Sequence, residues 1–111
     1  MDIEIDDLKK FKNIHLIGIG GVSMSAVAET LKSWGYTVTG SDLNSSQITE
    51  KLNEHGIRTV IGHNLEDCKN ADLIIYNAAI PEDDIEMKLA REKRNSNYRK
   101  RKICWIFNKK I

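Results

Sequence analysis

The sequence is short of the features that mark secreted, membrane and metal-binding proteins. Its longest apolar runs, such as residues 72–80, are far too short to span a bilayer. The N-terminal segment MDIEIDDLKK is acidic and lacks the apolar stretch of a secretory signal. The two cysteines, Cys68 and Cys104, are far apart and in no metal-ligand spacing, which is typical of chains in a reducing compartment. We therefore expect a cytoplasmic protein in which Cys68 is a partly buried structural residue and not a nucleophile.

Acidic residues are absent from the last part of the chain. All sixteen Asp and Glu precede residue 94, against ten Lys and Arg, so residues 1–93 carry a net charge of −6. Residues 94–111 contain seven Lys and Arg and no acid, a net charge of +7. This break divides the chain into a domain at 1–93 and a basic tail at 94–111, which we expect to be disordered or packed in a makeshift way.

Apolar runs alternate with helical patterns along the domain, and a hydrophobic content of 41% is enough for a packed core. Strands are predicted at residues 13–20, 36–42, 57–62 and 71–80, and helices at residues 23–35, 45–56 and 82–93. This alternation indicates βαβ units, and therefore an α/β fold with a Rossmann-like, doubly wound parallel sheet, truncated to about four or five strands. The first dozen residues are expected to form a loose, partly helical lead-in.

Particular residues are expected to begin, end and bury the helices. Ser45 or Ser46 should cap the second helix, and Gly35 and Gly56 should follow the ends of the first and second. The inward faces are predicted from helical spacing: Met24, Val27, Leu31 and Trp34 in the first helix, Ile48 and Leu52 in the second, and Ile85 and Leu89 sharing a face in the third.

A glycine-rich segment, GIGGVSM at residues 18–24, joins the first strand to the first helix. Glycines let a backbone approach a phosphate, and the amides at a helix start attract an anion. The third glycine of the dinucleotide fingerprint would fall at Ser23, which argues against NAD and supplies a hydroxyl for a helix cap or a phosphate oxygen. A tight turn that binds nothing is the alternative, but the strand before and the helix after favour anion binding.

Polar residues after the other strands are further candidates. Asp42 follows the second strand, where an acid commonly accepts hydrogen bonds from a ribose, although a turn cap is an equal alternative. His63 follows the third strand at the edge where ligands bind. His15 is expected to be a neutral core residue and His55 a cation at a helix C-terminus. No two histidines share a metal-ligand spacing, so no metal site is expected.

Three stretches resemble one enzyme family. They are HLIGIGGVSMSAVAETLKSWGYTVTGSD, HGIRTVIGHN and ADLIIYNAAIPEDDIEMKLAR. Over roughly residues 12–93 they resemble the N-terminal domain of the UDP-N-acetylmuramate–L-alanine ligases, a Mur ligase family of peptidoglycan synthesis. The most specific parts are the GIGGVSMS loop, the GSD after the second strand and the NAAIP after the fourth. The murein-peptide ligases of the recycling pathway share much of this signature.

The resemblance implies a ligand, the UDP portion of UDP-N-acetylmuramate. It implies that Ser41 and Asp42 lie near the ribose and uracil, and that His63, Asn77 and Ala78 line the rim of the same crevice. It also implies that loop amides cradle the diphosphate, the loop being Gly18, Ile19, Gly20, Gly21, Val22, Ser23 and Met24. No catalytic residue is expected in this chain.

The ATP-binding segment of that family, G-T-H-G-K-T-T, does not occur in the sequence. In the full-length enzymes the resemblance implies ATP and Mg, with activation of the muramoyl carboxylate to an acyl phosphate that L-alanine attacks. We therefore expect a substrate-binding fragment without a cofactor of its own and inactive alone. The alternatives are a free-standing NAD-type module and a protein whose basic tail binds nucleic acid or an anionic membrane. We expect neither nucleic acid nor membrane as a partner.

The tail suggests a shifted reading frame. If one extra adenine lies in an A-rich run near codons 93–94, reading one base later allows the sequence EIPIIEREKFVGYLTKK, which resembles the family's next strand and helix. Part of this agreement is freely chosen through wobble bases. Part is forced, because the single codon of Trp105, followed by any isoleucine codon, gives glycine in the shifted frame. A natural basic tail is the alternative.

Overall fold

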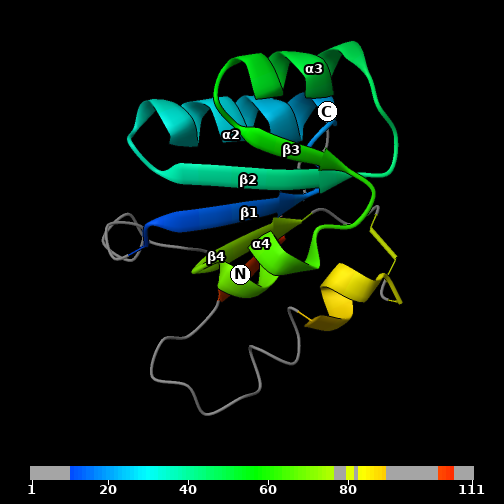
Figure 1. Ribbon diagram of the computed structural model, residues 1–111. Helices are drawn as coiled ribbons and strands as arrows, with labels where there is room; N and C mark the ends of the chain where they lie inside the picture. The colour runs from blue at the N-terminus through cyan, green and yellow to red at the C-terminus, as the bar shows by residue number, and fades with distance from the viewer. Residues whose placement is uncertain (1–10, 77–79, 82, 90–102, 107–111) are drawn as a thin grey trace.

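The computed structural model describes residues 11–76, 80–81, 83–89 and the strand at 103–106. One sheet runs through it, with helices on both of its faces (Figure 1). The sheet order is β3-β2-β1-β4-β5 and every neighbouring pair is parallel. Its strands are β1 (Asn13–Ile17), β2 (Thr37–Asp42), β3 (Arg58–Ile61), β4 (Leu73–Tyr76) and β5 (Ile103–Ile106). The predicted Rossmann-like doubly wound parallel sheet is confirmed.

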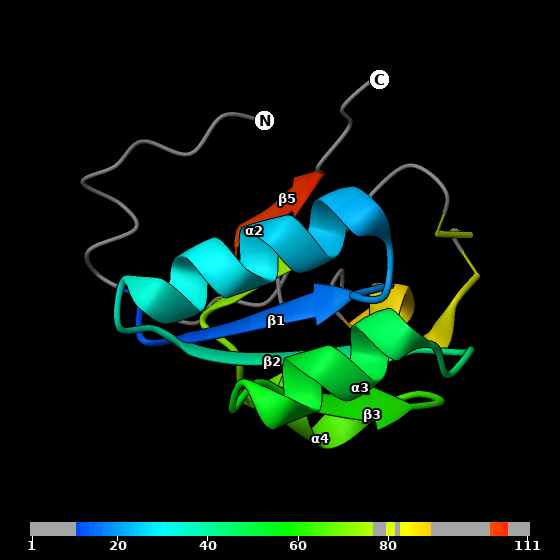
Figure 2. The ribbon, with the colours of Figure 1, turned by 90° about the horizontal axis from the view of Figure 1, so that it is seen from above.

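Helices α2 (Val22–Ser33) and α3 (Gln47–Glu54) cover one face of this sheet, and α4 (Leu65–Asn70) lies on the other (Figure 2). Strand β1 is buried on both sides, so its successive side chains enter two different clusters. Ile14 and Leu16 pack with α2 and α3, whereas Ile17 packs with α4 and with Met87 from the helical segment 85–89. His15 is fully buried, as predicted for a core residue.

The predicted helix ends are mostly confirmed. Gly35 and Gly56 have φ values of +96° and +84°, which favour glycine, and each follows the C-cap residue of its helix. Ser46, and not Ser45, caps α3 by accepting a hydrogen bond from the amide of Thr49. Helix α2 begins after Gly21 without a side-chain cap, so Ser23 lies within its first turn and does not cap it.

Two predictions about the helices need correction, and one helix was not predicted. Trp34 is 64% exposed because it is the C-cap of α2, where the chain turns toward β2, and Ala28 is buried against the sheet instead. The predicted helix at 82–93 begins only at residue 85, where Asp84 caps it by accepting hydrogen bonds from the amides of residues 86 and 87. Residues 82 and 90–93 of that prediction lie outside the described residues. Helix α4, which Asn64 caps, was not predicted.

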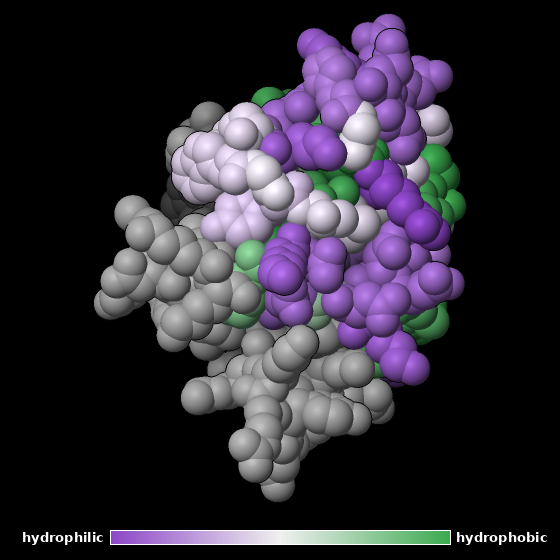
Figure 3. Space-filling model, turned by 60° about the vertical axis from the view of Figure 1, so that its left-hand side comes forward, coloured by the Kyte–Doolittle hydropathy of each residue, from purple (hydrophilic) through white to green (hydrophobic). Residues whose placement is uncertain are grey.

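The tail contributes strand β5, which pairs with β4 in the register Leu73 with Ile103 to Tyr76 with Ile106. The other tail residues lie outside the described part of the chain. Among the described residues, no helix is both long and apolar enough to cross a membrane. The described part of the face in Figure 3 is largely hydrophilic, with small hydrophobic areas.

Candidate functional site

The glycine loop, residues 18–24, leaves the carboxyl end of β1 at the point where the strand order reverses. From β1 the chain proceeds to β2 and β3 on one side, and then to β4 on the other side. Open parallel sheets bind ligands at such switch points, outside the carboxyl ends of their strands. The loop that the sequence singled out therefore lies where this fold holds ligands.

Hydrogen bonds within the protein fix the first half of the loop. The carbonyl oxygen of Ser41, near the end of β2, accepts from the amides of Gly18 and Ile19 at 2.8 and 3.0 Å. The amide of Gly21 donates to the carbonyl of Gly18 at 3.3 Å. Gly18 has a φ of +76°, a conformation that side chains rarely tolerate. These amides are therefore engaged by the protein itself.

Asp42 ties the middle of the loop to the end of β2. Its Oδ2 accepts from the Gly20 amide at 2.9 Å, and its Oδ1 accepts from the Asn44 amide at 3.0 Å. The second contact is the turn cap that was the alternative role for this residue. A Cβ at Gly20 would lie 2.7 Å from Asp42 Oδ2 and 3.1 Å from Thr49 Cγ2. A side chain at residue 20 would therefore have to push the Asp42 carboxylate aside.

The second half of the loop is different, because it forms the first turn of α2. Among the described residues, no acceptor takes a hydrogen bond from the amides of Val22, Ser23 or Met24. These are the orphan donors of a helix start, and the helix dipole adds positive potential there. Met24 buries its side chain in the core while Val22 is 75% exposed. This turn thus offers backbone donors to an anion.

Ser41 is 2% exposed, and its hydroxyl donates to Glu86 Oε2 at 2.6 Å. To donate to a ligand, this hydroxyl would have to give up its hydrogen bond to Glu86. Glu86, which the sequence analysis did not single out, is itself fully buried. Its Oε1 accepts from the amide of Asn64 at 2.6 Å and lies 3.5 Å from Nε2 of His15. His15 Nδ1 in turn is 2.9 Å from Thr39 Oγ1.

Burial alone would raise the pKa of Glu86, because a low-dielectric interior disfavours the charged form. The polar contact with His15 and the hydrogen bonds from Ser41 and the Asn64 amide oppose this effect, and the net result is a pKa below the ordinary value of 4.5. Glu86 is therefore a carboxylate at neutral pH. A buried anion thus lies beneath the edge that carries the glycine loop.

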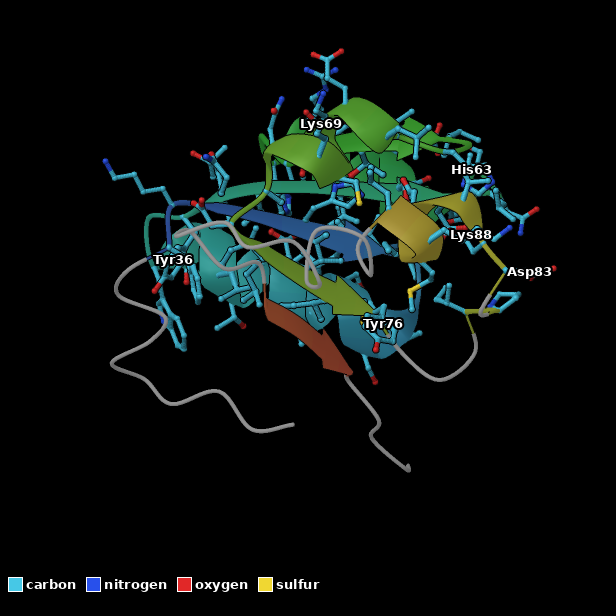
Figure 4. All side chains as sticks on the ribbon, turned by 90° about the horizontal axis from the view of Figure 1, so that it is seen from below. Tyr36, His63, Lys69, Tyr76, Asp83 and Lys88 are labelled. Carbon is cyan, nitrogen blue, oxygen red and sulfur yellow. The ribbon has the colours of Figure 1, made fainter. Side chains whose placement is uncertain are left out.

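His63 lies at this edge too, with its Nδ1 3.7 Å from Asp84 Oδ2. Figure 4 shows it at the same end of the molecule as Asp83 and Lys88, opposite Tyr36. The side chains of His63, Asp84 and Glu86 are close enough to hold a cation, but both Glu86 oxygens already accept hydrogen bonds. Asn77 and Ala78 lie outside the described residues.

An open groove of about 540 Å³ lies away from the glycine loop, on the face covered by α4. Its walls come from α4 and the segment 85–89: Leu65, Glu66, Lys69, Ile85, Lys88 and Leu89. Ile85 and Leu89 share this face, as their spacing predicts, but Ile85 is 43% exposed. None of the predicted site residues lines this groove.

A family model described as "Mur ligase family, catalytic domain" matches residues 13–107. A UDP-N-acetylmuramate–L-alanine ligase of Acetivibrio thermocellus is 49% identical over 89 residues, which are 80% of this chain and 19% of that protein. The chain thus spans about a fifth of the length of this relative.

Solved structures show the same likeness. The UDP-N-acetylmuramate–alanine ligase of Thermotoga maritima superposes with a TM-score of 0.71 at 33% identity, over 85% of this chain and 20% of that one. A murein peptide ligase of Psychrobacter arcticus superposes with a TM-score of 0.66 at 25% identity, over 73% of this chain and 17% of that one.

Proposed function

Since the chain belongs to the Mur ligase family, we propose that it binds the UDP portion of UDP-N-acetylmuramate. In this proposal it corresponds to the N-terminal, substrate-binding part of the ligase that joins L-alanine to that nucleotide sugar in peptidoglycan synthesis. The name of the relative at 49% identity supports the substrate. In the same proposal, adding the amino acid and binding ATP and Mg require parts of the full-length enzyme that this chain, at 19% of the relative's length, does not match.

The observation that carries the proposal is the row of three unengaged amides at the start of α2, at the switch point of the sheet. A diphosphate matches these donors in charge and in hydrogen-bonding capacity, and it needs no basic side chain when a helix start supplies the positive potential. The amides of Val22, Ser23 and Met24 are therefore the proposed diphosphate donors. The Ser23 hydroxyl is half-buried beside them and is proposed as a fourth donor.

The remaining loop residues have a supporting part in this proposal. Gly18, Ile19 and Gly20 use their amides to hold the loop to β2, which keeps the first turn of α2 in place. Asp42 keeps lone pairs on both oxygens after its two hydrogen bonds, so a ribose hydroxyl can still donate to it. Ser41 supports the loop through its carbonyl, which accepts from the loop amides, and through the hydrogen bond of its hydroxyl to Glu86.

His63 is proposed for the rim of the crevice, with Asn77 and Ala78 assigned to it on the family resemblance alone. Its side chain is 35% exposed and paired with Asp84, so its ring faces solvent on the ligand-binding edge. A cytoplasmic location is part of the same proposal, because the nucleotide precursors of the wall are made there.

A murein-peptide ligase is the second candidate. The structural match to the Psychrobacter protein supports it, at a lower TM-score and identity than the match to the Thermotoga ligase. Binding of free UDP does not separate the two candidates, because both relatives have the same fold over these residues.

An NMR titration of the ¹⁵N-labelled chain tests the proposal. UDP and UDP-N-acetylmuramate should shift the amides of Val22, Ser23 and Met24 in a saturable way, whereas inorganic pyrophosphate should saturate them only at a higher concentration. NADH serves as the competing dinucleotide. Larger shifts with NADH, or no shifts between residues 18 and 24 with UDP, would contradict the proposal.

A further inference from the structure

Glu86 brings together segments that are far apart in the sequence. It belongs to the helical segment 85–89, and its carboxylate contacts residues of three other parts of the fold. Ser41, near the end of β2, donates to one oxygen at 2.6 Å, and the Asn64 amide after β3 donates to the other at 2.6 Å. His15 of β1 approaches the second oxygen at 3.5 Å. One side chain therefore fixes the segment that follows β4 against β1, β2 and β3.

A single residue, Ser41, connects this carboxylate to the glycine loop. The Ser41 hydroxyl bonds Glu86, while the Ser41 carbonyl accepts from the amides of Gly18 and Ile19. Any displacement of Ser41 therefore displaces the beginning of the loop. Asn64, held by the other oxygen, caps α4 and adjoins His63 at the rim.

Two donors hold the Glu86 carboxylate at this buried position: the Ser41 hydroxyl on one oxygen and the Asn64 amide on the other. The buried Nε2 of His15 lies 3.5 Å from the second oxygen and has no hydrogen-bond partner among the described residues. The side chains of His63 and Asp84 also lie within 4.8 Å of the carboxylate, Asp84 as a second acid. A glutamine of the same shape would place an N–H₂ group against one of these donors.

We propose that Glu86 is a positioning residue of the nucleotide site: it holds the end of β2, the cap of α4 and the middle of β1 together and, through Ser41, keeps the glycine loop in its ligand-binding geometry. This inference rests on the proposed function for its ligand, but the alignment of the loop can be measured without one. Glu86 contacts neither the loop amides nor any proposed ligand atom. Its effect on binding is therefore indirect.

The variant Glu86→Gln tests the inference, with Glu54→Gln as the matched control. Both remove one negative charge, and Glu54 is an exposed residue of α3 on the other face of the sheet. UDP is an anion, so loss of a negative charge by itself strengthens or leaves unchanged its affinity. We expect Glu86→Gln to weaken UDP binding by at least about tenfold, opposite to that charge effect, and Glu54→Gln to leave it within about twofold.

Hydrogen exchange in the ligand-free chains provides the second measurement. We expect faster exchange and shifted resonances for the amides of Gly18, Ile19 and Asn64 in Glu86→Gln, with the amide of Leu52 in α3 unchanged. Ser41→Ala, which removes only one hydroxyl, should affect Gly18 and Ile19 but not Asn64. Ile57→Val, a change in the core cluster under α2 and α3, serves as the control for general destabilisation. It should change exchange evenly across the elements, without a selective effect on Gly18 and Ile19, and should leave UDP affinity unchanged.

The outcomes separate the two proposals. If the unaltered chain does not bind UDP but the loop amides respond to Glu86→Gln, the proposed function fails and the positioning role stands without its ligand. If Glu86→Gln binds UDP as the unaltered chain does, or leaves the exchange of Gly18 and Ile19 unchanged, the positioning role is wrong. A uniform change of exchange across all elements, equal to that of Ile57→Val, also overturns it.

Discussion

Gly40 of β2 lies directly beneath Ile19 of the glycine loop, and replacing it by alanine tests how the sheet holds the loop. A Cβ at residue 40 would lie 2.3 Å from Ile19 Cδ1, 2.9 Å from its Cγ2 and 2.7 Å from its Cβ. Rotation of the Ile19 side chain can relieve the first two contacts. It cannot relieve the third, because Cβ moves only with the backbone. The loop must therefore move away from β2 in Gly40→Ala.

The cost follows from the same contacts. Adding a methyl group to a well-packed core lowers the free energy of unfolding by about 1–3 kcal/mol. We expect the upper part of this range, because Ile19 is fully buried and the amides of Gly18 and Ile19 must stretch their bonds to Ser41. For a domain of this size, each kcal/mol lowers the melting temperature by about 4–8 °C.

Thermal and urea unfolding followed by circular dichroism measure this cost. Gly21→Ala is the matched control, since its added Cβ would have no atom nearer than 3.7 Å and should cost less than about 1 kcal/mol. A double-mutant cycle with Ile19→Gly isolates the contact, because Cβ and every atom beyond it are then absent at residue 19. If Gly40→Ala costs no more than the control, or as much with glycine at residue 19 as with isoleucine, the reasoning is refuted.

Four further predictions follow from the site and the sequence. Gly20→Val should lower UDP affinity by more than about tenfold in a titration, because the side chain would displace Asp42 and break a charge-assisted bond worth about 1.5–3 kcal/mol; unchanged affinity would show that this bond does not hold the loop. The pKa of Glu86 is lowered in the folded chain, so its contribution to stability is full above about pH 4.5 and is lost as the pH falls through the folded pKa; urea midpoints should therefore decline less below that pH in Glu86→Gln than in the unaltered chain, and parallel curves would contradict this sign. The chain with UDP-N-acetylmuramate, L-alanine, ATP and Mg should release no phosphate above a blank, because the sequence has no G-T-H-G-K-T-T segment, and turnover that persists through rigorous purification would contradict the assignment as a binding fragment. In the gene, deleting one base near codon 94 should open a frame that continues into G-T-H-G-K-T; if sequencing finds no such frame, the frameshift hypothesis is wrong.

The fold was predictable because its signals are local and repeated. Buried parallel strands are continuous apolar runs, and glycine at residues 35 and 56 marks helix ends whatever the tertiary context. The missed helix α4 has only six residues, too few for a periodic pattern. Trp34 satisfied the helical spacing, yet its exposure depends on where the chain leaves α2, which spacing does not encode.

The candidate site was predictable only in part. The glycine loop and Asp42 belong to one strand–loop–helix–strand unit, so their proximity follows from the topology. Glu86 was not predictable, because it lies in a run of acids typical of an exposed helix start, and its partners Ser41 and Asn64 are 45 and 22 residues away. The use of the Gly18, Ile19 and Gly20 amides by the protein is likewise a tertiary feature.

Those internal bonds of the glycine loop have a consequence for the thermodynamics of recognition. A loop whose backbone is already held by Ser41 and Asp42 has lost its conformational freedom during folding, so a ligand does not bear that entropic cost again. Binding should then proceed without rearrangement of the backbone, at a rate limited by encounter and not by loop ordering. The heat capacity change of binding should correspondingly reflect only the surface covered by the ligand, with no contribution from residues that fold on contact.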